Sequence, residues 1–250
     1  MKLEEYKKMF LLEDKHFWFL GKRMFIKTLL NRYIPNKNLL ILDIGSGTGG
    51  LTKFLNHYGK VIGLEKNKYA TKLAKKRGLK IIYGDAQKLP FKKNLFSLIT
   101  LFDVLYHKNI KDEKIVIKEV NRVLKNNGYF LITDSAFNFL KSIHDKALYG
   151  NKRFTLFYLR KILEKEGFRI IKSSYIFFFL FSLIFIKRKV LDRFIKNNHS
   201  DLRELPKIIN LFLMKLISFE AWLLKYINFP VGSSLIILAQ KEIFVFKKNN

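Results

Sequence analysis

The chain has no cysteine among its 250 residues, and this absence excludes several kinds of chemistry. Without thiols the protein can form no disulfide, thiolate metal site, iron–sulfur cluster or cysteine nucleophile. Any reaction that it performs must therefore depend on other side chains or on a bound cofactor.

Long apolar runs and an apolar N-terminal leader are also lacking. The most apolar run, residues 175–186, is shorter than the roughly 20 residues that cross a bilayer, and Lys187–Lys189 follow it. Residues 1–8 mix Lys and Glu and do not resemble a signal peptide, so we expect a cytoplasmic protein. Two alternatives stay open for the run. It is an interfacial element at the inner face of the membrane, or a strand followed by a buried helix that closes a pocket with residues 208–227.

Acidic residues are scarce. The chain has 20 Asp and Glu against 48 Lys and Arg, which gives a net charge of +28. Such an excess favours anionic partners, either nucleic acid, an anionic membrane surface or phosphorylated carriers. Because the lysines are spread along the chain, a drift towards A/T-rich codons explains the same charge, and charge alone does not identify a partner.

Apolar segments of strand length alternate with helix-like segments from residue 39 to residue 135. Strands are expected at 39–44, 61–64, 80–83, 95–101, 129–133, 168–172 and 234–239. A helix is expected over 111–125, with Gly128 as its left-handed cap, and another over 155–166. Continuous apolar strands separated by helices indicate a parallel sheet that is covered on both faces.

A glycine-rich segment, Asp43–Gly50, lies between the first strand and a helix, the context in which such motifs bind ligands. Its glycines formally satisfy the G-x-G-x-x-G dinucleotide pattern and let the backbone turn sharply. Asp43 would repel a pyrophosphate, however, and suits the ammonium group of S-adenosylmethionine. A nicotinamide cofactor is therefore disfavoured.

Two more acidic residues follow strand ends. Glu65 closes the second strand and can accept hydrogen bonds from ribose hydroxyls. Asp85 follows the third strand and can accept a bond from an adenine amino group. The carboxyl ends of successive parallel strands meet at the usual ligand crevice, so these side chains and Asp43 are expected to converge. The alternative is that all three are solvated carboxylates without a ligand.

The motifs at 42–49, 61–65, 83–91, 96–99 and 120–130 resemble, in order and spacing, those of class I S-adenosylmethionine-dependent methyltransferases of the type 11-like group. The resemblance covers residues 16–175. It implies a Rossmann-like three-layer α/β sandwich whose seven-stranded sheet is mostly parallel, with an antiparallel last strand. It also implies S-adenosylmethionine as cofactor, S-adenosylhomocysteine as product and no metal. The implied cofactor-binding residues are Asp43, Gly45, Ser46, Gly47, Thr48, Gly49, Glu65, Lys66, Asp85, Ala86, Phe102 and Asp103.

The segment 13–23 resembles the aromatic N-terminal segment of methyltransferases associated with surface-glycan and lipid-linked sugar pathways. The resemblance implies a lid in which Trp18 contacts the cofactor and Arg23 faces its methionyl carboxylate. Residues 143–145 and 152–155 resemble that group's His-Asp and Arg-Arg-Tyr-Thr elements, although Gly150 stands where His is common there, and Lys152 and Phe154 replace Arg and Tyr. Core packing is the alternative for the aromatic residues.

Three residues are candidates for catalysis. His107 follows the fourth strand, where the acceptor usually meets the methyl group in this family, and His144 with Asp145 could form an oriented base. Each has a structural alternative, such as a hydrogen bond that orders a loop. Residues 102–107 do not form the Asn/Asp-Pro-Pro-aromatic motif, so methylation of an exocyclic base amine is not expected.

These patterns predict one domain. Residues 1–35 form a helical lid, 36–174 the cofactor-binding core, 175–232 an apolar and basic insertion on the acceptor side, and 233–243 the last strand. The predicted function is methyl transfer to an oxygen of a small or lipid-linked acceptor, with nitrogen or carbon as alternative atoms. The alternatives are an RNA methyltransferase and a catalytically silent S-adenosylmethionine-binding protein.

Overall fold

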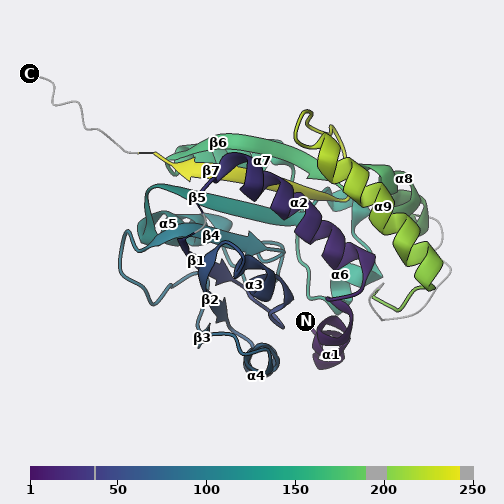
Figure 1. Cartoon of the computed structure of the whole chain (residues 1–250), viewed down its shortest axis with the longest axis horizontal. Helices are drawn as coiled ribbons and strands as arrows, with labels where there is room; N and C mark the ends of the chain where they lie inside the picture. Colours follow the sequence, from purple (N-terminus) through teal and green to yellow (C-terminus); the bar gives the residue numbers. More distant parts are fainter. Residues whose placement is uncertain (37, 190–201, 243–250) are drawn as a thin grey trace, which may run out of the picture.

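The structure is a computed structural model that describes residues 1–36, 38–189 and 202–242; it leaves the side chains of residues 143, 144 and 187–189 undescribed. Within this part, one sheet lies between two layers of helices (Figure 1). The strands are β1 (Leu39–Ile44), β2 (Gly59–Glu65), β3 (Ile81–Tyr83), β4 (Phe96–Phe102), β5 (Leu124–Ser135), β6 (Phe168–Ile176) and β7 (Ser234–Lys241). The helices are α1 (Leu3–Leu12), α2 (Phe17–Tyr33), α3 (Gly50–Leu55), α4 (Lys68–Lys76), α5 (Glu113–Val123), η1 (Asn138–Leu140, a 3-10 turn), α6 (Ile143–Ala147), α7 (Leu156–Lys165), α8 (Phe178–Lys189) and α9 (Lys207–Leu223).

The sheet has the strand order β3-β2-β1-β4-β5-β7-β6. Strands β1 to β5 pair in parallel, and β7 runs antiparallel to both β5 and β6. The predicted mostly parallel sheet with an antiparallel last strand is therefore confirmed. The order reverses at β1, between β2 and β4, and this switch point is where open α/β sheets bind their ligands.

Two apolar cores cover the two faces of the sheet, as a parallel sheet requires. On one face Phe96 and Phe130 of the sheet pack with apolar side chains of α5 and α7. On the other face Phe25 of α2 packs with Phe177 and with α8 and α9. The apolar strands predicted from sequence are buried because both of their faces are covered.

The predicted helix over 111–125 is wrong at its C-terminal end. Helix α5 ends at Val123, and β5 begins directly at Leu124, which is fully buried and pairs with Phe96. The left-handed residue is Asn127, with φ +60°, and Gly128 lies inside the strand instead of capping the helix. Burial of Leu124 in the sheet therefore ends the helix before the glycine is reached.

The apolar run 175–186 forms the end of β6 and most of α8, so its strand-then-helix order is as predicted, but the helix is only partly buried, since Leu183 and Ile186 are exposed. Helix α9 then lies along α2 (Figure 1). The two helices approach closely at Gly21, where a Cβ atom would come within 2.9 Å of Ile217 Cγ2. In the described chain, no helix has the length and apolar character needed to cross a membrane.

Glu220 of α9 is fully buried and joins the two C-terminal helices. Its carboxylate accepts hydrogen bonds from the backbone N–H groups of Phe178, at 2.9 Å, and Phe179, at 3.3 Å, at the start of α8. These donors have no partner inside their own helix, so the carboxylate caps α8 from a neighbouring helix. Burial nevertheless raises the pKa of Glu220 to about 7.

This raised pKa predicts how stability depends on pH. Between about pH 4.5 and 7 the unfolded chain loses the Glu220 proton while the folded chain keeps it, so rising pH favours unfolding. Relative to Glu220→Gln, the wild type should lose up to about 3 kcal/mol of unfolding free energy across this window and nothing more above it. Urea unfolding at several pH values measures the difference. An equal difference at pH 4.5 and 7.5 would contradict the raised pKa, and exposed Glu164→Gln is the matched control.

Candidate active site

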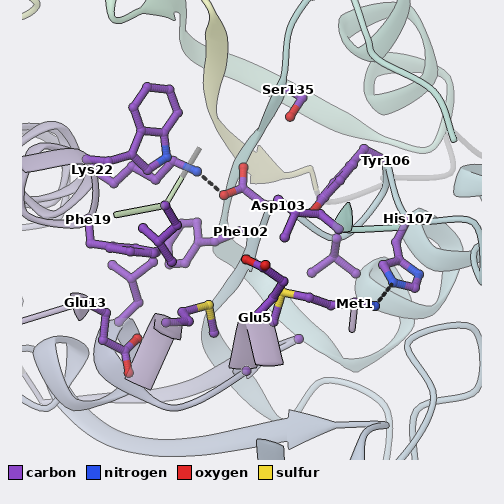
Figure 2. A pocket seen from close by; sticks show the side chains of 18 of the residues that line it. Met1, Glu5, Glu13, Phe19, Lys22, Phe102, Asp103, Tyr106, His107 and Ser135 are labelled. Atoms are coloured by element: carbon purple, nitrogen blue, oxygen red, sulfur yellow. Dashed lines mark hydrogen bonds and ion pairs between the residues drawn. The ribbon is translucent and has the colours of Figure 1, made fainter. Parts of the chain in front are cut away.

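A cavity of about 890 Å³ lies at the carboxyl ends of the central strands, beneath α1 and α2 (Figure 2). Its walls come from the glycine loop after β1, the end of β2, and the loops after β3 and β4. Asp43, Glu65 and Asp85 all line it, so the predicted convergence of the three strand ends is confirmed. Apolar residues of α8 and α9 form the remaining wall.

The glycine loop has a backbone that side chains would disturb. Gly45 and Gly47 have φ +74° and +54°, and a Cβ on Gly45 would lie 2.3 Å from Val104 Cγ2. Ser46 also lines the cavity, and its buried Oγ has no hydrogen-bond partner in the described structure. The loop therefore brings backbone close to the cavity, where a bound polar ligand could contact it.

Two of the predicted carboxylates are buried and hydrogen-bonded. Asp43 accepts bonds from the hydroxyls of Thr52, at 2.6 Å, and Thr100, at 2.8 Å, and burial raises its pKa to about 6. Glu65 accepts bonds from the N–H groups of Gly47, at 2.8 Å, and Asn67, at 2.7 Å. Burial also raises the pKa of Glu65. Glu65 thus ties the glycine loop to the end of β2.

The third carboxylate, Asp85, is more open. Lys66 donates to it at 2.5 Å and the backbone N–H of Gln87 at 2.9 Å. Partial burial opposes ionisation, but these bonds outweigh it and lower the pKa of Asp85. Lys66 and Ala86 line the cavity beside it, as expected for the cofactor-binding set.

The cavity collects acidic side chains although the chain as a whole is strongly basic. Its acidic lining residues are Glu5, Glu13, Asp43, Glu65, Asp85 and Asp103. Its basic lining residues are Lys22, Lys66, Lys108, Arg153 and Arg203. Acids and bases are therefore nearly equal in number here, against 20 to 48 in the sequence. The cavity is much less basic than the chain as a whole, and its acidic side chains can contact a positively charged group of a ligand.

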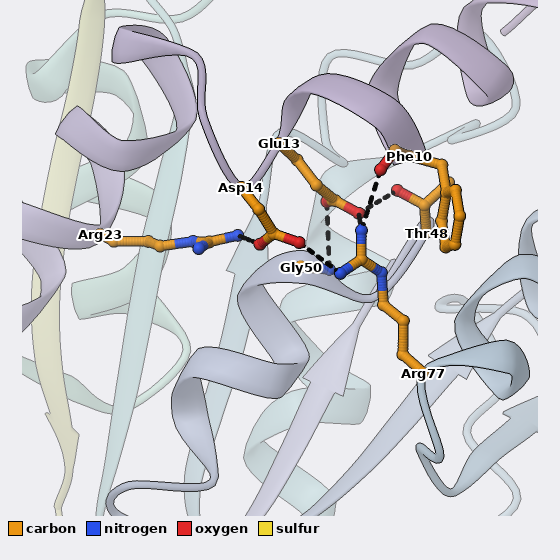
Figure 3. A network of polar contacts seen from close by, with 7 residues as sticks. All are labelled: Phe10, Glu13, Asp14, Arg23, Thr48, Gly50 and Arg77. Carbon is orange, nitrogen blue, oxygen red and sulfur yellow. Dashed lines mark hydrogen bonds and ion pairs between the residues drawn. The ribbon is translucent and has the colours of Figure 1, made fainter.

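Helix α1 is fastened over the glycine loop by a polar network around Glu13 (Figure 3). The buried Glu13 carboxylate accepts bonds from Thr48 Oγ1, at 2.7 Å, and from the Gly50 N–H that begins α3, at 3.0 Å. Arg77 donates to Glu13 at 2.9 Å and to Asp14 at 2.6 Å. These bonds connect the end of helix α1 to the glycine loop and to Arg77, which follows α4.

Two expectations change in this network. Arg23 donates to Asp14 at 2.8 Å and is absent from the cavity lining in the described structure, so it does not face a methionyl carboxylate here. Thr48 is fully buried against Glu13, and Gly49 supplies the left-handed N-cap of α3. Thr48 and Gly49 therefore help to fix the conformation of the loop but do not line the cavity in the described structure.

The polar network around Glu13 predicts the behaviour of an Arg77→Met variant. Removing the guanidinium leaves the buried Glu13 carboxylate without its cation, and a hydrogen bond to a charged group contributes about 1.5–3 kcal/mol. Amide exchange in residues 3–12 should therefore become about 10–100-fold faster, which hydrogen-exchange mass spectrometry measures. Lys76→Met, on an exposed neighbour, is the control. Unchanged amide exchange in α1 would show that apolar packing, and not the ion pair of Arg77 with Glu13, keeps α1 in place.

Trp18 lines the cavity from α2, as predicted, but it also packs. Its ring stacks on Phe177 with centroids 4.0 Å apart, and the Lys22 ammonium lies 5.7 Å from its centroid. Phe102, at the end of β4, lines the cavity too. The aromatic N-terminal segment therefore contributes to the core and to the cavity wall together.

Lys22 and Asp103 form an ion pair inside the cavity, which Figure 2 shows between α2 and the loop after β4. Lys22 is buried. It lies one helical turn after Trp18, and this spacing is the sequence signal that could have placed Lys22 on the cavity side of α2. Asp103 Oδ2 accepts from Lys22, whereas its buried Oδ1 has no hydrogen-bond partner in the described structure. Asp103 also has φ +55°, a left-handed conformation that is uncommon outside glycine.

A second carboxyl group, Asp134, is fully buried nearby. Burial, together with the charge of Asp103, raises its pKa to about 8. Asp134 is therefore mostly protonated near neutral pH.

The three predicted catalytic residues differ in what the structure shows. His107 lines the cavity with Nε2 3.2 Å from the Met1 amino group, and its Nδ1 accepts from the Asn109 N–H. Burial lowers its pKa to about 4, so it is neutral at pH 7. Asp145 is buried and takes two bonds from Arg153, at 2.9 and 3.1 Å, which orient that arginine at the cavity. The side chain of His144 lies outside the described structure.

Known methyltransferases are similar to this chain in sequence and in fold. Residues 42–132 match the family model of the methyltransferase domain. An uncharacterized protein of Methanocaldococcus jannaschii is 38% identical over 113 residues, covering 44% of this chain and 43% of that protein. A demethylmenaquinone methyltransferase of Geobacillus stearothermophilus is 30% identical over 158 residues, covering 59% of this chain and 63% of that protein.

The fold is shared over a longer part of the chain. A SAM-dependent methyltransferase from Thermotoga maritima, 19% identical, superposes with a TM-score of 0.59 over 96% of both chains. The chain spans about half the length of the curated relatives that it matches. The protein therefore has the class I methyltransferase fold, and its residues 42–132 match the methyltransferase domain of that family.

Proposed function

We propose that this protein is an S-adenosylmethionine-dependent methyltransferase that methylates an oxygen of a small or lipid-linked acceptor. The observation that carries the proposal is the cavity at the sheet's switch point, where acidic side chains gather in an otherwise basic protein. The domain match over residues 42–132 and the name of the Geobacillus relative support it. An association with surface-glycan or lipid-linked sugar chemistry is part of this proposal.

The residues present suit this cofactor. Glu65 would accept hydrogen bonds from the ribose hydroxyls and Asp85 from the adenine amino group, each at the end of its strand. Asp43 would hold the methionyl ammonium directly or through water. Ser46 of the glycine loop lines the same cavity. When bound, S-adenosylmethionine supplies an activated methyl group.

Asp103 is the residue that we propose as the base. Its side chain lines the cavity, is 32% exposed and pairs with Lys22 through Oδ2, so the carboxylate can take the proton of an acceptor hydroxyl there. The neutral Asp134 behind it adds no second negative charge. His107 is the alternative base. Its lowered pKa makes it a weaker proton acceptor than an unperturbed histidine.

The acceptor side of the cavity is apolar, which supports an apolar or lipid-linked acceptor over RNA. Leu183 and Ile184 of α8 and Ile209 and Leu213 of α9 line it. An RNA methyltransferase would instead bind RNA with a steep dependence on salt. The name of the Geobacillus relative makes demethylated quinones one class of acceptor to test, and label on carbon in that reaction would favour the carbon alternative over oxygen.

Transfer of a labelled methyl group tests the proposal. The protein is incubated with methyl-labelled S-adenosylmethionine and with a lipid extract, a demethylated quinone or RNA in separate reactions. Label should enter the organic phase, and magnetic resonance should place it on oxygen. At a cofactor concentration that does not saturate the site, Glu65→Ala should lower transfer by about 10–100-fold, while the exposed Glu164→Ala should leave it unchanged. Label in RNA would favour the RNA alternative, and cofactor binding without transfer would favour a silent binding protein.

A further inference from the structure

Most of the large apolar side chains that the described chain exposes belong to α8, α9 and the turn after α9. On α9 and this turn they include Ile208, Leu211, Phe212, Phe219, Trp222 and Tyr226, a set that we call the α9 face. Phe212 is 65% exposed and Trp222 49%. An exposed apolar patch of this kind marks an interaction surface.

The α9 face is separate from the side of the helix that holds the fold. Its members stand at positions 208, 211, 212, 219, 222 and 226, spacings that place them on one side of a helix together with Lys215. The other side carries Ile217, Glu220 and Leu224, all buried against α2 and α8. The α9 face is therefore not needed for packing within the described chain.

We propose that the α9 face docks on an anionic membrane surface. Exposed Lys207 and Lys215 accompany it, and Lys225 follows the helix. The acidic residues of this region are engaged elsewhere, since Glu220 points inward and Glu204 pairs with Lys15. A helix with an apolar face, flanking lysines and few acids lies in the interface of anionic bilayers, and Trp and Tyr favour the same depth.

The α9 face also extends to the mouth of the cavity. Ile209 of α9 and Leu183 of α8 are both exposed and both line the cavity. The interfacial alternative concerned residues 175–186. There Phe177 and Leu180 are buried, while the end of α8 exposes Leu183, Phe185 and Ile186 beside the larger set on the α9 face. If the proposed function is correct, a lipid-linked acceptor would reach Asp103 without leaving the bilayer surface. The docking itself does not depend on catalysis.

Vesicle flotation tests the proposal with the full chain. Protein is mixed with vesicles of phosphatidylcholine, with and without 30% phosphatidylglycerol. The wild type should float with the anionic vesicles, and Phe212→Ser/Trp222→Ser should reduce the bound fraction at least about tenfold. The matched control is Phe157→Ser/Ile115→Ser, which removes two exposed apolar side chains from α7 and α5.

Three results would contradict membrane docking by the α9 face. No flotation of the wild type, or equal losses in both double variants, would overturn the proposal. A wild-type dimer in solution that Phe212→Ser/Trp222→Ser dissociates would also overturn it and assign the α9 face to a second copy. Binding of S-adenosylhomocysteine, measured on every variant, should be unchanged, so failure of docking is distinguishable from failure of the proposed function.

Discussion

Replacing Asp103 by asparagine is expected to lower kcat by about 10²–10⁴-fold, the usual contribution of a general base. The amide keeps the size of the side chain but cannot take the acceptor's proton. If Asp103 acts as a base and not as a cofactor ligand, S-adenosylhomocysteine should bind the variant within a few-fold of wild type. Single-turnover methyl transfer and calorimetry measure the two quantities.

Loss of Asp103 also leaves the buried Lys22 without its partner, which could destabilise the protein by about 3–5 kcal/mol. The double variant Lys22→Met/Asp103→Asn removes both charges and should recover most of this stability without recovering activity. Recovery of activity in the double variant would contradict the role of base. Loss of cofactor affinity in a folded Asp103→Asn variant would instead place Asp103 in the cofactor site.

Replacing Glu65 by alanine is expected to weaken S-adenosylhomocysteine binding by about 10–100-fold. Hydrogen bonds to a charged group contribute about 1.5–3 kcal/mol, and 1.4 kcal/mol corresponds to a factor of ten in affinity. Glu65 also holds the Gly47 N–H, so the loop loses an anchor in the same variant. Calorimetric titration measures the affinity, with Glu164→Ala as control. Equal affinity in both variants would exclude Glu65 from the cofactor site.

The sheet and the cavity's floor were predictable because they depend on local patterns. Buried strands such as Leu39–Ile44 are apolar on both faces, and the glycine loop follows a strand directly. The carboxyl ends of parallel strands must meet at one edge, so the sequence alone predicts that Asp43, Glu65 and Asp85 lie together.

The placement of the lid residues was not predictable in the same way. Lys22 and Arg23 are neighbours in sequence, yet successive residues of a helix point about 100° apart. Lys22 points into the cavity and Arg23 towards Asp14. Helix α2 has apolar residues on several sides, so its pattern does not fix which side covers the sheet. Only the packing against β4 and α9 decides this.

Buried acidic caps were missed for a related reason. Glu13 and Glu220 lie in segments where a charged residue suggests solvent exposure, but both accept backbone N–H bonds at the start of another helix. Such a contact joins residues 37 and 42 positions apart in the chain. A pattern within one helix carries no information about it.

The central claim is that the cavity binds S-adenosylmethionine, and calorimetric titration of its demethylated product, S-adenosylhomocysteine, tests it most directly. The account predicts one site per chain with micromolar affinity, weakened in Glu65→Ala and in Asp43→Asn, and no heat from NAD. Absence of binding to the folded wild-type protein would contradict it, and so would affinity that both variants retain in full.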